Sequence, residues 1–562
     1  MASRQAFSRI LSSAEIAASA AGTALIVWLL IRMLGHAGGL WRDEAAVLHL
    51  VAAPSLSDLW SLLEFEAFPL LWYLVLRTWV TLGGDKDLGL RVLPFLINLG
   101  NLALLWWCAR VLDSWSQDDP TRSLKPSGLQ IPAVPLLSLA LVGACPDLYQ
   151  FGGSLRAYGL GILLMLWTIT AVWRLLEQPT KRRTAVACFA AVLSVQCVYY
   201  NSLMLLALCL AGVVVCVMRR QLRTAVLVLG VGCVAAISLL PYLGIFRRVH
   251  AFNMVVKSET IDPVRLMANL VHAIDPRSTG VRWIWLTVGI LIAVTFIKHL
   301  IVRWREPWTT LHDRQLFLGV ALMLGTICQF GFLWLLSYES SNSGWYYLTL
   351  LVFAAVISDS FLYIQGLRRS VWRITRLALA VAAMTLSWPL LWEATGTRLT
   401  NIDVVSNVLG EKADRNDLVI ISHWWMGISF QRYYHGTASW ETLPPISDHR
   451  AHRYDLLKEQ MSRTEALAPL LQRAEQTLRA GHRVWVVGPT HFVGPEVRLE
   501  PLPPAPHSPT GWKEEPYLRY WRVQLSQLLQ KRGARYSEVP ISLSDPVIFH
   551  ENPRLAVFEG SP

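Results

Sequence analysis

Charged side chains are scarce in this chain. Asp, Glu, Lys and Arg make up 16% of its 562 residues, whereas soluble domains carry roughly 25%. Hydrophobic residues make up 53%, and the mean hydropathy is +0.38. The charge deficit argues against an ordinary soluble protein. Together with 25 Trp, a residue that favours membrane–water interfaces, it predicts a polytopic membrane protein.

Several chemical signatures are also missing. The eight cysteines have no C-x-x-C spacing and lie in or at the edge of apolar runs, as small buried hydrophobes do. No glycine-rich dinucleotide fingerprint is present, so we expect no direct binding of a nucleotide sugar. The net charge of +12 does not indicate nucleic-acid binding, because the basic residues cluster between apolar runs as the positive-inside rule requires.

These basic clusters predict an orientation. Arg4 and Arg9 precede the apolar run 14–34, which is long enough to span and lacks a small-residue cleavage site. We therefore expect a retained signal anchor with a cytoplasmic N-terminus. Residues 68–82 carry Arg77 and fall short of the roughly 20 residues needed to cross. We therefore predict about 11 spans, an odd number that places the C-terminus outside. The predicted spans are residues 14–34, 92–111, 131–149, 158–176, 185–200, 203–218, 225–246, 283–302, 316–337, 346–364 and 377–392.

The composition changes after Trp392. Residues 394–562 contain no apolar run long enough to span, and no phosphate loop, nucleophile elbow or zinc motif. Residues 417–422 and 483–488 are typical of short buried strands, and 455–480 of a helix or helical pair. We predict a membrane domain, residues 1–393, followed by an extracytoplasmic α/β domain, residues 394–562.

Asp43 and Glu44 form an adjacent carboxylate pair about nine residues past the first span, a distance of about 14 Å if helical. Ionisable groups this close to lipid are functional candidates, although acidic residues also complement the first turn of a solvated helix. Arg247 and Arg248 fall in a loop predicted outside, against the usual charge bias. A lipid-linked donor explains both features, since basic side chains would hold its phosphate and a carboxylate would deprotonate an acceptor hydroxyl.

Six short motifs strengthen this hypothesis by their order along residues 10–365. The motifs are Asp43-Glu44-Ala45, Phe68-Pro69-Leu70-Leu71-Trp72-Tyr73, Leu90-Arg91 with Pro94, Ser154-Leu155-Arg156-Ala157-Tyr158, Val198-Tyr199-Tyr200 and Tyr346-Tyr347-Leu348. They resemble motifs of the GT-C glycosyltransferases, specifically the protein-mannosyltransferase and aminoarabinose-transferase-like group (glycosyltransferase family 39). The resemblance implies an all-α polytopic fold of about 11 transmembrane helices, with juxtamembrane helices in the first external loop.

By this resemblance the protein is an inverting transferase of the plasma (inner) membrane. It would move a sugar from a polyprenyl-phosphate donor to an extracytoplasmic hydroxyl on a glycan, lipid or protein acceptor. No metal or cofactor is implied. The alternative is a non-catalytic membrane protein, either a transporter or a relative that only binds lipid-linked sugar. A transporter would place ionisable residues mid-span, and the predicted spans are nearly free of them.

The resemblance also assigns roles. Asp43 is the general base or the residue that orients the acceptor, Glu44 supports it, and Arg91 is a structural partner of the pair. Arg156, Arg247 and Arg248 are candidates for phosphate binding. The alternatives are a side chain that reaches to the lipid headgroups for Arg156 and lipid-headgroup binding for Arg247 and Arg248. Tyr158 belongs with the substrate-binding residues.

The chain departs from the family pattern at three positions. Phe68 replaces a His, Ser154 replaces a Glu and Tyr346 replaces an Arg. Glu64 and Glu66 lie close to Phe68 and either substitute for the lost His or lie on a solvated face.

Overall fold

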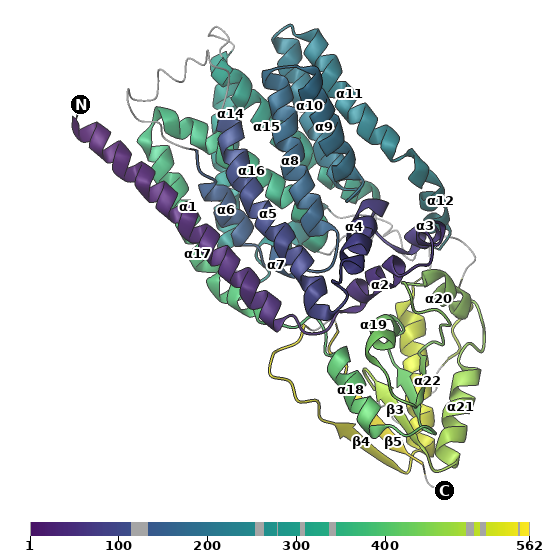
Figure 1. Cartoon of the computed structure of the whole chain (residues 1–562). Coiled ribbons are helices and arrows are strands. Elements are labelled where there is room, and N and C mark those ends of the chain that lie inside the picture. Colours follow the sequence, from purple (N-terminus) through teal and green to yellow (C-terminus); the bar gives the residue numbers. More distant parts are fainter. Residues whose placement is uncertain are drawn as a thin grey trace.

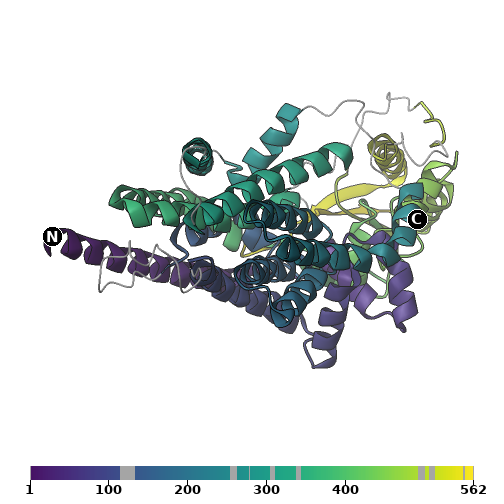
Figure 2. The ribbon, with the colours of Figure 1, turned by 90° about the horizontal axis from the view of Figure 1, so that it is seen from above.

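The computed structural model describes residues 2–113, 133–252, 263–277, 279–303, 310–336, 344–490, 500–505, 513–548 and 551–560. A bundle of long helices makes up the N-terminal two thirds, and a small sheet flanked by helices makes up the rest (Figure 1). Three short helices of the first loop, α2, α3 and α4, lie between the two parts (Figure 1). The two chain termini lie at opposite ends of the molecule (Figure 2).

Nine helical segments in the described ranges are long and apolar enough to cross a membrane. Their outward faces are apolar, as on α14, where Trp283, Ile290 and Ile297 are each more than half exposed. Such faces suit lipid rather than water. The helices are α1 (Ala2–His36), α5 (Asp87–Asp113), α8 (Tyr158–Glu177), α10 (Asn201–Met218), α11 (Leu222–Ser238) continued through η3 (Leu240–Tyr242) into α12 (Leu243–Phe252), α14 (Val281–Arg303), α15 (Thr310–Leu336), α16 (Leu348–Arg368) and α17 (Ser370–Thr395).

Two of the 11 predicted spans are shorter than expected. Within 131–149, helix α6 (Leu136–Gly143) ends before Pro146, which begins a separate short helix, α7 (Pro146–Gln150). Within 185–200 the helix is α9 (Lys181–Val195), whose 15 residues cover about 22 Å of a hydrocarbon core about 30 Å thick.

The first loop forms α2 (Arg42–Val51), α3 (Leu56–Leu62), η1 (Leu63–Phe65) and α4 (Leu70–Thr81). Helix α4 has 12 residues and a length of about 18 Å, too short to cross, as the sequence predicts for 68–82. Later short elements are α13 (Pro263–Ile274) and η5 (Gly344–Tyr347).

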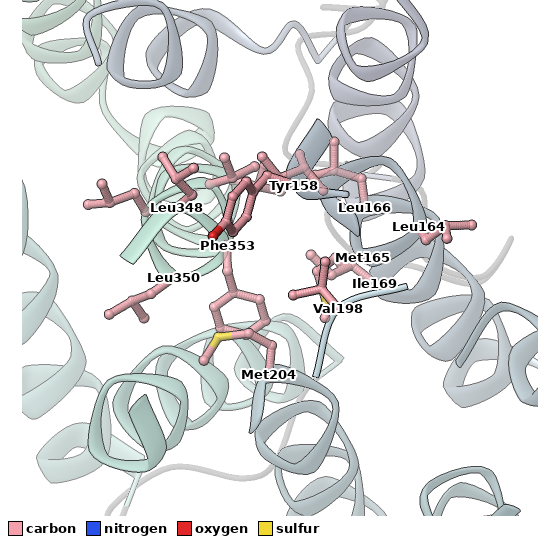
Figure 3. Packing of buried hydrophobic residues seen from close by; sticks show 14 of the residues in the cluster. Tyr158, Leu164, Met165, Leu166, Ile169, Val198, Met204, Leu348, Leu350 and Phe353 are labelled. Atoms are coloured by element: carbon pink, nitrogen blue, oxygen red, sulfur yellow. The ribbon is translucent and has the colours of Figure 1, made fainter. Parts of the chain in front are cut away.

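The bundle core is apolar around α8, α10 and α16. Tyr158, Leu166, Met204 and Phe353 belong to one buried cluster, whose packing Figure 3 shows at close range. Efficient packing of such side chains, together with backbone hydrogen bonds inside each helix, is what stabilises a helical bundle in lipid.

Four buried charges inside the bundle were not predicted. Arg373 of α17 donates to Glu15 of α1 through Nε at 3.0 Å, and Arg376 donates to Asp359 of α16 through Nη2 at 2.7 Å. The Ser138 hydroxyl of α6 donates to the other oxygen of Asp359 at 2.8 Å. Because the two carboxylates and two guanidinium groups neutralise one another, the network joins four helices and leaves no net charge.

The C-terminal part is an α/β unit with a five-stranded sheet in the order β2-β1-β3-β5-β4. Strand β1 pairs in parallel with β2 and β3, and β5 pairs antiparallel with β3 and β4. Helices α18 and α19 cover one face, and α20, α21 and α22 cover the other. The elements are α18 (Ile402–Lys412), β1 (Leu418–Ile421), α19 (Met426–Tyr433), β2 (Ser439–Thr442), α20 (Tyr454–Met461), α21 (Ala468–Arg479), β3 (Arg483–Val487), α22 (Glu515–Arg532), β4 (Arg535–Val539) and β5 (Leu555–Glu559).

The predicted fold class, a helical membrane part with a C-terminal α/β part, is therefore confirmed. The predicted strands are β1 and β3, and the predicted helical pair is α20 and α21. The domain boundary at 393/394 stays a prediction.

The α/β part packs directly on α2. The fully buried Glu551 accepts a hydrogen bond from the Arg42 amide at 3.0 Å and two more from the hydroxyls of Ser429 and Thr400. The Tyr433 hydroxyl accepts from the Leu40 amide at 2.6 Å. These bonds fix the N-terminus of α2, which carries the carboxylate pair.

Candidate functional site

Glu44 holds the start of α2 in place. Its side chain is fully buried and accepts from the Trp41 amide at 3.3 Å, the capping-box bond of a helix N-terminus. It also accepts from the Leu155 amide at 2.8 Å and pairs with Arg91 of α5 at 3.3 Å. Arg91 in turn donates to the carbonyl oxygens of the turn before α2. Both side chains are saturated by the protein, so we assign them a positioning role.

We expect Glu44→Gln to destabilise the protein by about 1–3 kcal/mol, the penalty for an unsatisfied buried group. Gln keeps the shape and one acceptor, and the Arg91 guanidinium keeps its carbonyl partners, including Gly39 at 2.7 Å. The melting temperature of the purified protein in detergent measures this. Asp85→Asn, which changes an exposed carboxylate later in the same loop, is the control. A Glu44→Gln protein with the wild-type melting temperature would contradict the positioning role.

Asp43 faces outward from the same turn, with 20% of its side chain exposed. Its Oδ1 lies 3.4 Å from Nε of Arg42 and 3.3 Å from Nε2 of His452, which belongs to the α/β part. Its Oδ2 lies 3.9 Å from Nη2 of Arg156, and the Asp43 carbonyl accepts from Nη1 of Arg156 at 3.1 Å. Three basic side chains from three separate segments therefore converge on this carboxylate.

The protonation state of Asp43 follows from these neighbours. Burial raises the pKa of the Asp43 carboxyl, but Arg156, His452 and Arg42 outweigh burial and hold this pKa below its ordinary value. The group is therefore ionised across the physiological pH range. It is a stable negative charge and a hydrogen-bond acceptor at the end of an apolar bundle.

Glu66 completes the charged cluster. Its side chain is 1% exposed, and its Oε2 accepts from Nη1 of Arg156 at 3.0 Å and from the Tyr73 hydroxyl at 3.2 Å. Its Oε1 is buried and has no hydrogen-bond partner among the described residues. The Arg156 guanidinium also lies over the ring of Phe68, 4.7 Å from its centroid. Arg156 thus bridges two carboxylates and rests on the aromatic ring of Phe68.

The other predicted site residues lie around this cluster or away from it. Tyr158 is buried and packs edge-on against Phe68, with ring centroids 5.0 Å apart. Arg247 and Arg248 are exposed on α12, and Arg248 pairs with Glu64 of η1. No contact joins either arginine to Asp43 in the described part of the chain. The structure thus brings Asp43, Glu44, Arg91, Arg156 and Tyr158 together and leaves Arg247 and Arg248 apart.

Two further positions depart from the family pattern. Ser154 is buried, and its hydroxyl donates to the Phe151 carbonyl at 2.7 Å. Tyr346 packs edge-on against Tyr200, with centroids 5.4 Å apart. At both positions the replacement takes part in local packing or turn formation.

Sequence reasoning missed His452 and undervalued Glu66. No local signal marks His452, because it contacts α2 only after the α/β part has folded. Glu66 did carry a signal, namely a carboxylate two residues before Phe68, but the sequence alone does not distinguish it from a carboxylate on a solvated face. Among the described residues, no group of three or more His, Cys, Asp and Glu side chains could hold a metal ion.

Comparison with known proteins gives likenesses of structure alone. No family model matches the chain, and no curated protein matches it. ArnT from Cupriavidus metallidurans bound to undecaprenyl phosphate is 12% identical with a TM-score of 0.46, over 83% of this chain and 92% of that one. The Archaeoglobus fulgidus oligosaccharyltransferase in the apo form is 11% identical with a TM-score of 0.47, over 84% and 69%.

Proposed function

We propose that this protein is a membrane glycosyltransferase that moves a sugar from a polyprenyl-phosphate donor to an acceptor hydroxyl. The observation that carries this is Asp43, an ionised and partly exposed carboxylate at the end of an apolar bundle, surrounded by Arg42, Arg156 and His452. A polyprenyl chain dissolves in lipid and presents its phosphate and sugar at the bilayer surface, the level at which a loop helix next to the first span would meet it.

The chemistry needs few protein groups. The acceptor oxygen bonds to the anomeric carbon while the carbon–oxygen bond to phosphate breaks, and the electron pair leaves with the phosphate. Attack from the face opposite the phosphate inverts the anomeric configuration, which we propose here. The acceptor hydroxyl gives up its proton to a base of the site as its oxygen attacks, and Asp43 stabilises positive charge on the sugar ring in the transition state. We expect no metal or cofactor to take part.

One substrate contact is suggested by a buried carboxylate oxygen that has no hydrogen-bond partner among the described residues. The orphaned Oε1 of Glu66 is an acceptor for a substrate hydroxyl, because a buried carboxylate oxygen without a hydrogen bond is unfavourable. Arg156 is held by Glu66 and Asp43, so its charge is already largely compensated. Arg247 and Arg248, exposed on α12, remain our proposal for cations that attract the donor phosphate.

We further propose that the protein lies in the plasma (inner) membrane with α2 and the α/β part outside the cytoplasm. In a cysteine-free background, Ser57→Cys and Asn416→Cys should react with a membrane-impermeant maleimide applied to intact cells. Arg182→Cys, which belongs to a basic cluster, should react only after permeabilisation. All three positions are exposed in the structure. Protection of Asn416→Cys in intact cells would contradict this orientation.

A purified-protein assay tests the function. The protein in nanodiscs is given a panel of polyprenyl-phosphate monosaccharides and a membrane extract as acceptor, with and without EDTA. Release of polyprenyl phosphate is followed by mass spectrometry. We expect release from one donor class, unaffected by EDTA. Donor binding without release would instead indicate the alternative function, a non-catalytic binder of lipid-linked sugar.

A further inference from the structure

The segment Asp448–Asp455 projects from the α/β part toward the first loop and is internally fixed. The Asp448 carboxylate accepts from Nη2 of Arg450 at 2.9 Å and pairs with Arg453. Arg453 also pairs with Asp455 at 2.7 Å, and its guanidinium lies 4.8 Å from the ring centroid of Phe65 in η1. A segment held at both ends places the side chains between them reproducibly.

His452 lies between these ion pairs and is 12% exposed. Its Nε2 lies 3.3 Å from Oδ1 of Asp43, and no described residue is hydrogen-bonded to its Nδ1. Asp43 contacts the imidazole directly, and Arg42 and Arg156 lie beyond that carboxylate. Arg453 is the next residue in the chain, and the ring of Tyr454 is 6.1 Å away. With a carboxylate at Nε2, the ring proton resides there and the lone pair resides on Nδ1.

Asp43 by itself is a weak proton acceptor, because its neighbours stabilise the ionised carboxylate. Arg42 and His452 face one of its oxygens and Arg156 faces the other, and each of these neighbours favours the ionised form. A carboxylate in this position can orient an imidazole and stabilise the imidazolium that forms on protonation, as in Ser-His-Asp triads.

We propose that His452 is the general base of the reaction and that Asp43 orients it, so that the α/β part completes the active site. This inference rests on the proposed function. The acceptor hydroxyl gives its proton to Nδ1 of His452 as its oxygen bonds to the anomeric carbon. The electron pair of the broken bond leaves on the phosphate, and the imidazolium then returns its proton to water.

The experiment uses the full chain in nanodiscs with the donor that the wild type consumes. We expect kcat/KM of the wild type to show an acid limb, falling as pH is lowered, because a protonated base cannot accept the hydroxyl proton. His452→Gln should be about 10²–10⁴-fold slower at neutral pH and should lose this acid limb. Added imidazole should restore part of the activity of His452→Ala, which a purely structural role would not allow. His435→Gln, at an exposed position of the same domain, is the control.

The outcomes distinguish a failure of the role proposed for His452 from a failure of the proposed transferase function. A His452→Gln enzyme that keeps both the wild-type rate and the acid limb overturns the role of His452 and leaves the transferase intact. A His452→Ala enzyme that is folded, inactive and unresponsive to imidazole also overturns it, because the residue would then act only through packing. If the wild type releases polyprenyl phosphate from no donor, the proposed function itself fails, and this inference fails with it.

Discussion

Replacing Asp43 with Asn is expected to lower turnover by about 10²–10⁴-fold with little loss of folding. Asn has nearly the same shape, and the position is 20% exposed, so packing changes little. The negative charge that orients His452 and stabilises the sugar in the transition state is removed. Initial rates of polyprenyl phosphate release and the melting temperature, measured on the same preparation, separate the two effects.

Asp85→Asn is the matched control, because it removes a carboxylate from an exposed site of the same loop. It should keep wild-type turnover. If Asp43→Asn and Glu44→Gln were both fully active, the transferase interpretation of the carboxylate pair would be wrong. If Asp43→Asn were active while Glu44→Gln were folded and inactive, the roles within the pair would be reversed.

Replacing Arg156 with Met is expected to affect both stability and activity. The substitution leaves Glu66 as a buried charge without its guanidinium partner, which destabilises a protein by about 3–5 kcal/mol. It also removes the contact with Asp43 and the cation above Phe68. We expect a large fall in melting temperature and no measurable turnover, whereas Arg182→Met at an exposed position should change neither.

A second substitution distinguishes packing from function. In Arg156→Met/Glu66→Gln the buried charge is gone, so most of the lost stability should return while turnover stays low. Recovery of turnover along with stability would show that Arg156 serves the fold alone. Failure to recover stability would show that the charge on Glu66 is not what Arg156 neutralises.

The parts of this fold that depend on local pattern could be predicted from the sequence. Long apolar runs predicted the nine helices of the described ranges that are long enough to cross a membrane, and short apolar runs predicted β1 and β3. Spans 131–149 and 185–200 were less accurate, because hydropathy does not register the break before Pro146 or the end of α9 at Val195. Strand β4, with a mostly polar and exposed sequence, gave no strand signal at all.

Prediction of the site from the sequence is limited in the same way, because short motifs are visible in a sequence and long-range contacts are not. Asp43 and Arg156 could be selected because each belongs to a short motif with a recognisable order. The separate roles of Asp43 and Glu44 could not be predicted, because they depend on what surrounds each carboxylate. Glu44 contacts Arg91 and the Leu155 amide, which are distant in the sequence. Buried charge pairs in the bundle, such as Arg376 with Asp359, and the approach of His452 to Asp43 depend on long-range packing that one sequence does not display.

The most direct measurement follows two labels on one donor. A polyprenyl-phosphate sugar carrying tritium on the sugar and phosphorus-32 in the phosphate is incubated with the wild-type protein and with Asp43→Asn, using membrane extract as acceptor. The account predicts that the wild type moves tritium to the acceptor and leaves phosphorus-32 on the lipid, and that Asp43→Asn does so at least about 100-fold more slowly. Labels that stay together on the lipid with the wild type, or that travel together to the acceptor, would contradict it.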